Sequence, residues 1–213
     1  MSTQPTSSDI YSSREAAKLC FDDISRLVEE TRYSFEIWRA LFYIENAEEW
    51  LTYKKYDPFF RETERAHTNA IIINLFILGE KEDKKGHSVF YLFRKLVGGA
   101  LINPNWAKEW QFVLDRITNY RDKVALVRNK YLAHRDKNYS WQKAMQEIGL
   151  TPEDLNMMTS LCFNLIADAA RLLCEIDFFT ETQVKKSIRK SIRHLTDALL
   201  TDKADFNPDE EPL

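Results

Sequence analysis

Hydrophobic residues recur at helical spacing along most of this chain. Between about 13 and 54 they follow one another three or four residues apart, with an imperfect phase, at Cys20, Ile24, Leu27/Val28, Phe35, Trp38 and Leu41/Phe42. Ser12 and Glu15 have the spacing of a capping box that opens a helix. The pattern predicts one long helix or two abutting ones. Asp57 and Pro58 then end this segment and begin the next one.

A second predicted helix spans about 58–79 and contains a nine-residue run, 70–78, that is apolar except for Asn74. Such a run predicts burial on nearly all sides. Its β-branched residues would also suit a strand, but the charged helical flanks and the lack of a partner strand favour a helix. A polar loop, 79–86, and a shorter predicted helix, about 88–97, follow before a Gly-Gly pair.

The most regular pattern lies in a predicted helix over about 104–134. Its apolar positions are spaced alternately four and three residues apart, at Val113, Ile117, Tyr120, Val124, Val127, Tyr131 and His134. This spacing predicts one face packed on the core. A short segment, 139–148, precedes two more predicted helices, about 151–178 and 181–200. The first of these opens on Thr151, followed by Pro, Glu and Asp, which favours a capped helix start.

The composition also favours helices. The 213 residues include 5 Gly and 6 Pro, where average usage would give roughly 25 in total. So few turn-forming residues argue against a many-stranded sandwich or barrel, and the 44% hydrophobic content argues against a disordered chain. We therefore predict an all-α bundle of about five to seven helices over 13–200. A disordered N-terminus, 1–12, and an acidic tail, 201–213, are expected to flank it.

The chain shows little sign of a metal, a cofactor or a membrane span. Its three cysteines, at positions 20, 162 and 174, form no CxxC pair, so buried thiols in the reducing cytoplasm are expected rather than a zinc site or disulfides. The first twelve residues are polar and no run of about 18 apolar residues occurs, which predicts a cytoplasmic protein without a membrane partner. No His lies three or four residues from another His or Cys, and phosphate-loop and nucleophile motifs are absent.

One basic segment, 121–137, is the strongest candidate for chemistry. It carries six basic and two acidic residues in a chain of net charge -3. Arg121, Arg128 and Arg135 are seven residues apart and form one ridge that drifts by about 20° per heptad. This ridge flanks the apolar stripe, which predicts that Arg128 lies at the edge of a packed surface. His134 is roughly 9 Å further along the helix axis and about 120° around it, so only a two-fold partner would bring such pairs into one cleft.

The sequence Arg128-Asn129-Lys130-Tyr131-Leu132-Ala133-His134 resembles the signature of the HEPN superfamily, the higher eukaryotes and prokaryotes nucleotide-binding domains. That signature is an Arg, a polar residue directly after it, and a His after four to six intervening residues. The preceding helices, with FILGEKEDKKGHSVFYLFRKL between two of them, resemble the abortive-infection branch. The resemblance covers about 13–200. Arg61 and His67 have the same spacing, but Glu62 rather than an Asn follows the arginine, and we interpret that match as chance.

The resemblance implies an all-α homodimer that acts as a metal-independent endoribonuclease, either a toxin or a phage-defence effector. In such proteins the 2′-hydroxyl of RNA attacks the neighbouring phosphate and leaves a 2′,3′-cyclic phosphate end. Arg128 would grip the phosphate, His134 would exchange a proton, and Asn129 would bind the phosphate or orient its neighbours. Tyr131 would stack on a base or close the dimer contact. Whether an antitoxin protein is a further partner stays open.

Further basic residues are candidates for binding RNA. Lys130 lies within the motif, and Arg121 and Arg135 lie on either side of it. The stretch 184–195 contains five basic residues and no acid: Lys185, Lys186, Arg189, Lys190 and Arg193. This stretch is interpreted as a solvated face, as a track for RNA phosphates whose binding weakens with salt, or as a basic helix on a membrane surface. Packing of its apolar side in the bundle disfavours the last. The acidic tail either shields the basic face or keeps the chain soluble.

Structural roles also account for the motif residues. His134 on an apolar stripe suits a core histidine, Arg128 suits an ion pair with Asp122 or Glu109, and Tyr131 suits packing. Three hypotheses therefore remain: a ribonuclease, a non-catalytic HEPN module that dimerises and binds RNA, a nucleotide or a partner protein, and a purely structural helical scaffold.

Overall fold

The computed structural model describes residues 7–42, 47–133 and 140–174, together with six single residues beyond them. No strand occurs in these residues, which confirms the all-α prediction. The elements in chain order are α1 (Ser7–Phe42), α2 (Ala47–Lys55), α3 (Asp57–Leu78), α4 (Val89–Gly98), α5 (Pro104–Ala133), α6 (Trp141–Ile148) and α7 (Pro152–Cys174).

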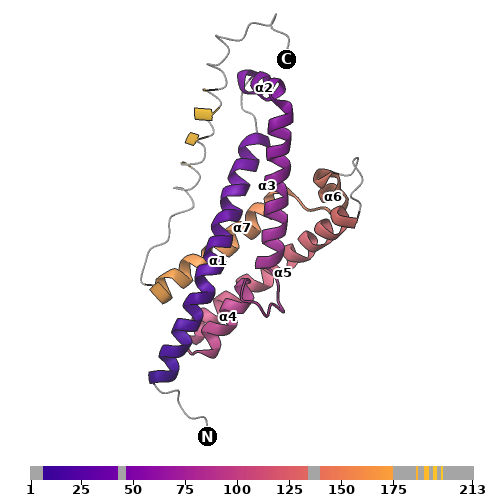
Figure 1. Ribbon diagram of the computed structural model, residues 1–213. Coiled ribbons are helices and arrows are strands. Elements are labelled where there is room, and N and C mark those ends of the chain that lie inside the picture. Colours follow the sequence, from indigo (N-terminus) through magenta and orange to yellow (C-terminus); the bar gives the residue numbers. More distant parts are fainter. Residues whose placement is uncertain are drawn as a thin grey trace, which may run out of the picture.

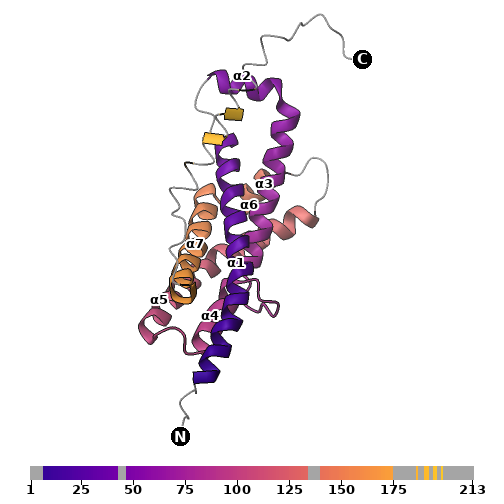
Figure 2. The ribbon, with the colours of Figure 1, turned by 60° about the vertical axis from the view of Figure 1, so that its left-hand side comes forward.

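The centre of the fold is a pair of long helices, α1 and α3, which lie side by side in both ribbon views, with α2 at one end (Figures 1 and 2). α1 also packs against α4 and α7, and α5 packs against α3, α6 and α7. The core is apolar, and its fully buried side chains include one from each of α1, α3, α4, α5 and α7: Ile24, Ile72, Leu96, Ile117 and Ile166. α5 is therefore held from several sides, with α6 attached to its C-terminal half.

Local capping explains where several helices begin. The Ser88 hydroxyl accepts a hydrogen bond from the Tyr91 N–H at 3.1 Å and starts α4. At α7, the Asp154 N–H donates to the Thr151 hydroxyl at 3.1 Å, and the Thr151 N–H donates to the Asp154 carboxylate at 3.2 Å. Such a reciprocal cap satisfies backbone donors that a helix start leaves without partners. The predicted start of this helix at Thr151 is confirmed.

The loop between α3 and α4 is organised around the carboxylate of Asp83. This carboxylate accepts hydrogen bonds from four backbone N–H groups, those of Lys85, Gly86, His87 and Ser88. Burial alone would raise the pKa of Asp83, but the four hydrogen bonds outweigh it and hold the pKa below its usual value. Arg94 donates to the carbonyl oxygens of Lys81 and Asp83 at 2.6 and 2.8 Å. The loop therefore has a defined conformation at the end of α3.

Two features of the fold differ from the sequence-based expectation, and one selects between two predicted alternatives. α1 begins at Ser7, so Ser12 and Glu15 lie inside the helix instead of opening it. Between Ser7 and Phe42 the helix is continuous, and α2 is a separate element, which favours the two-helix reading of this region. Ile73 is 44% exposed, because nine consecutive helical residues cover every side of a helix and one side of α3 faces outward. The apolar run is thus not buried all round.

α7 is an apolar helix of 23 residues. By length and composition it is the one described helix that could cross a membrane. More than half of its most apolar window is buried inside the bundle, a property that core helices of soluble proteins share. The predicted extension of this helix to 178 lies outside the described residues.

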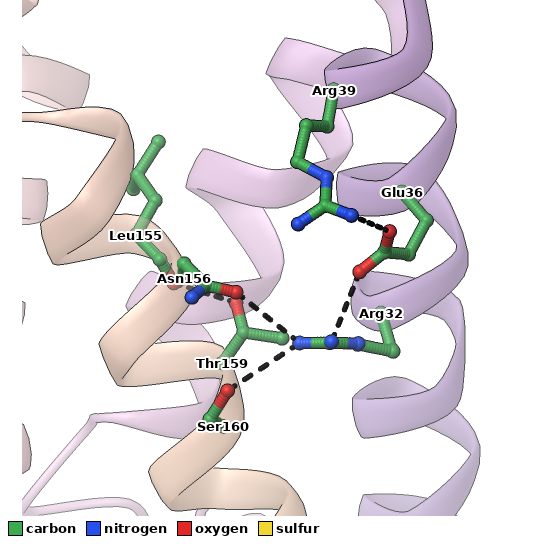
Figure 3. Close-up of polar contacts among 7 residues, drawn as sticks. All are labelled: Arg32, Glu36, Arg39, Leu155, Asn156, Thr159 and Ser160. Atoms are coloured by element: carbon green, nitrogen blue, oxygen red, sulfur yellow. Dashed lines mark hydrogen bonds and ion pairs between the residues drawn. The ribbon is translucent and has the colours of Figure 1, made fainter. Parts of the chain in front are cut away.

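A buried polar cluster joins α1 to α7 (Figure 3). Arg32 and Glu36 form an ion pair at 2.9 Å, and Arg39 contacts the other oxygen of the same carboxylate at 3.1 Å. From α7, the Asn156 side-chain oxygen and the Ser160 hydroxyl accept hydrogen bonds from the Arg32 Nη1 group at 3.5 and 3.4 Å. Charged residues are seldom fully buried unless they are paired. This cluster therefore fixes how α1 and α7 face each other.

Candidate functional site

The described part of the motif, residues 128–133, lies in the last turns of α5, whose apolar face is anchored in the core. Val124 and Val127 are fully buried, and they set the rotation of the helix. Arg128, the next residue, is consequently half-buried, while Asn129 is exposed. His134 lies outside the described residues, so its position relative to Arg128 stays a prediction.

The guanidinium of Arg128 lies against an aromatic ring from another helix. Its Cζ atom is 3.8 Å from the centre of the Phe76 ring on α3. Arg121, one heptad earlier on α5, has its Cζ atom 4.7 Å from the centre of the same ring. Contacts of this kind contribute about 0.5–2 kcal/mol, more when the cation is removed from water. The two arginines thus share one edge of the packed surface, as their spacing predicts.

The two arginines differ in how their charges are balanced. Arg121 forms ion pairs with Glu80 at 2.7 Å and with Asp122 at 3.6 Å. Within the described ranges, Arg128 has no ion pair with any carboxylate, including the predicted candidates Asp122 and Glu109. Its Nε atom is buried without a hydrogen-bond partner. Arg128 therefore contributes a positive charge that the described part of the chain does not neutralise.

Neighbouring motif residues connect α5 to α6. The Tyr131 ring stacks on Trp141, with ring centres 3.8 Å apart and planes inclined by 16°. The Trp141 indole N–H donates to the side-chain oxygen of Asn69 on α3, and Lys130 forms an ion pair with Glu147 on α6. Lys130 and Tyr131 thus have protein partners already, and one face of Tyr131 is covered.

The remaining predicted RNA-binding residues are only partly described. Lys186 and Lys190 are helical and exposed. Leu195, on the expected apolar side of the same stretch, is also exposed. Arg135, Lys185, Arg189 and Arg193 lie outside the described residues, so the proposed RNA track along 184–195 stays a prediction.

Four other reactive side chains in the described part of the chain, those of Cys20, Cys162, Arg61 and His67, offer no alternative site. Burial raises the pKa of Cys20 and Cys162 to about 12, so both thiols are protonated near neutral pH. Arg61 pairs with Asp57 on the surface at 2.6 Å, and burial lowers the pKa of His67. Among the described residues, no group of three or more His, Cys, Asp or Glu is placed to hold a metal ion.

Sequence reasoning missed the residues that surround Arg128. Phe76 reads as one more apolar residue in the run 70–78, and Glu80 reads as the start of a polar loop. The Glu80–Arg121 pair joins residues 41 positions apart, which helical periodicity does not encode. Trp141 carried a weak signal, because a large aromatic residue begins a short amphipathic segment.

The described geometry of Arg128 suits the binding of an anion. A guanidinium that has no carboxylate partner can donate two hydrogen bonds to a phosphate group. Comparison of the chain with protein-family models, with curated proteins and with solved structures gave no match. The site's own residues and the resemblance of its motif are therefore the grounds for a function.

Proposed function

We propose that this chain is a metal-independent endoribonuclease of the HEPN kind, acting in the cytoplasm as a toxin or phage-defence effector. The observation that supports it best is the state of Arg128. This residue is the first of the motif, it is held at the edge of α5, and it has no carboxylate partner in the described ranges. A structural arginine would more often be neutralised by an acidic residue.

The proposed reaction needs no metal ion. The 2′-oxygen of a ribose attacks the adjacent phosphorus, the bond from phosphorus to the 5′-oxygen breaks, and a 2′,3′-cyclic phosphate and a 5′-hydroxyl result. His134 takes the proton of the 2′-hydroxyl and returns a proton to the departing oxygen. Arg128 stabilises the extra negative charge on the phosphoryl oxygens in the transition state. Asn129, exposed at the next position, hydrogen-bonds the same phosphate.

The proposal includes a homodimer, because Arg128 and His134 do not meet within one straight helix. The outer face of α5 carries two exposed apolar side chains, Phe112 (65% exposed) and Leu126 (56% exposed). They are two heptads apart and so lie on one face. Large exposed apolar residues are typical of surfaces that associate. A second copy packed on this face would cover both side chains and approach Asn129.

The test is cleavage of RNA by the purified protein in the presence of EDTA. The wild type is expected to give fragments with 2′,3′-cyclic phosphate ends. Arg128→Ala and His134→Ala are expected to abolish cleavage while circular dichroism shows the helical content unchanged. Arg61→Ala is the matched control, because Arg61 has the same spacing to a histidine, and it should cleave like the wild type. A requirement for a divalent metal would contradict the proposal.

A second function is favoured by the contacts of the same residues. Arg128 lies on Phe76 and Tyr131 on Trp141, which also suits a motif used for packing. The chain would then be a non-catalytic module that dimerises and binds RNA, a nucleotide or a partner protein. It predicts that RNA is retained in a salt-sensitive manner without new product ends. In the EDTA assay, retention without cleavage by the wild type selects this function.

A further inference from the structure

The position of the Arg128 guanidinium is set by α3 rather than by its own helix. The Phe76 ring packs against the hydrophobic core, so the ring itself has little freedom. The Arg128 Cζ atom lies 3.8 Å from its centre. A long arginine side chain otherwise samples many rotamers, and ordering them is costly on binding. Contact with a fixed ring removes much of that freedom before any ligand arrives.

Residues just after the end of α3 also neutralise Arg121, the second cation beside the Phe76 ring. Arg121 is 4.7 Å from the same ring, and an unpaired charge there would repel Arg128. Glu80 neutralises Arg121 through an ion pair at 2.7 Å. Gly79 permits this arrangement, because a Cβ atom at its position would lie 2.6 Å from the Arg121 Cγ atom. The Phe76 ring near the end of α3, with Gly79 and Glu80 directly after the helix, therefore leaves Arg128, among the described residues, as the cation of this pair without a carboxylate partner.

The burial of Nε indicates which edge of the guanidinium is presented. Nε is buried and has no hydrogen-bond partner among the described residues, so it points into the protein, while Arg128 as a whole is partly exposed. The edge left for a ligand is formed by the two terminal Nη groups. Two parallel N–H donors match two oxygens of one phosphate.

We infer that Phe76 is a positioning residue, which holds the Arg128 guanidinium end-on to receive a phosphate of RNA. This inference rests on the proposed function for the identity of the ligand. It differs from that function because it concerns a residue of α3 outside the motif. Phe76 acts through Arg128 and does not itself contact the RNA.

The experiment is a double-mutant cycle on the dissociation constant for RNA that carries 2′-O-methyl groups, which cannot be cleaved by the proposed route. Phe76→Leu is expected to weaken binding about tenfold in the wild-type background, given the strength of such contacts. In the Arg128→Ala background the same substitution should have no further effect, because its partner is absent. Phe76→Tyr, which keeps an aromatic face, should bind within about twofold of the wild type.

A matched control separates positioning from packing. Phe93 is also an aromatic residue packed partly against the core, and in the described chain its ring stacks on Trp110 with centres 6.3 Å apart. Phe93→Leu should leave RNA binding unchanged. Equal losses for Phe76→Leu in both backgrounds, or none in either, would overturn the inference. Cleavage of unmodified RNA, measured separately on the wild type, tests the proposed function. If the wild type binds RNA without cleaving it, the double-mutant cycle still tests the role of Phe76. A wild type that binds no RNA overturns both.

Discussion

The guanidinium of Arg32 and the carboxylate of Glu36 form an ion pair enclosed between α1 and α7. The Nη2 and Oε1 atoms are 2.9 Å apart, and each side chain is 1% exposed. The residues are one helical turn apart on α1, and Figure 3 shows Arg32 reaching across to α7. Because both charges are removed from water, each depends on the other for compensation.

Replacing one partner of this pair is expected to be strongly destabilising. Glu36→Ala leaves Arg32 and Arg39 without their shared carboxylate, and breaking a buried pair in this way costs about 3–5 kcal/mol. The free energy of unfolding, from urea titration, measures the loss. Arg61→Ala is the control, since it breaks an exposed pair with Asp57 that contributes about 0–1 kcal/mol. Similar losses for the two variants would contradict a sealed pair.

Close approach between α3 and α5 makes Gly79 sensitive to a single methyl group. An added Cβ atom would lie 2.6 and 2.9 Å from the Arg121 Cγ and Cβ atoms and 2.9 Å from Met158 Cε. The atoms near the backbone cannot move away without shifting a helix, so Gly79→Ala should destabilise the fold by about 1–3 kcal/mol. Gly98 has nothing within 4 Å of such a Cβ atom, and there alanine should be neutral or stabilise by about 0.5–1 kcal/mol. Thermal unfolding of both variants measures the difference in stability between Gly79→Ala and Gly98→Ala. Equal stabilities would mean that α5 is free to shift away from the added methyl group.

Features encoded locally could be predicted from the sequence, and the site's surroundings could not. The Thr151 cap and the stripe through Ile117, Val124 and Val127 depend on residues within a few turns of one helix. The contact between Arg128 and Phe76 depends on how two helices are rotated against each other, which no periodic pattern specifies. Arg32 lies within an apolar stripe of the sequence, and a charge at such a position is a signal of a buried ion pair.

Two buried cysteines should be unreactive in the folded protein. Burial raises the pKa of Cys20 and Cys162 to about 12, so the reactive thiolate is almost absent at pH 8. Cys174 is partly exposed and is the one thiol expected to react. Titration with a chromogenic disulfide should give about one reacting thiol per folded chain and three in denaturant. Cys174→Ser should remove the fast reaction, and persistence of that reaction in the variant would show that a buried thiol is accessible.

The lowered pKa of Asp83 makes the stability of the α3–α4 loop depend on pH. Its pKa is lower in the folded chain than its usual value, because backbone hydrogen bonds outweigh the effect of burial. A group of this kind stabilises the fold when ionised, so its contribution is complete above about pH 4 and is lost as the pH falls through the lower folded value. Asp83→Asn should therefore destabilise the protein at pH 7 by at least about 1 kcal/mol. The difference in the free energy of unfolding between this variant and the wild type should be smaller at pH 3 than at pH 7.

Urea titrations of both proteins at pH 7 and pH 3 measure this difference. Glu82→Gln is the matched control, since Glu82 is an exposed acid beside Asp83, and its effect should be small at both pH values. A deficit of Asp83→Asn that stays constant between pH 7 and pH 3 would mean that the carboxylate holds the loop by shape rather than by charge. In that case the side-chain amide of the Asp83→Asn variant would lack the geometry to accept the four N–H groups, and the neutral carboxyl of the wild type at pH 3 would still accept them.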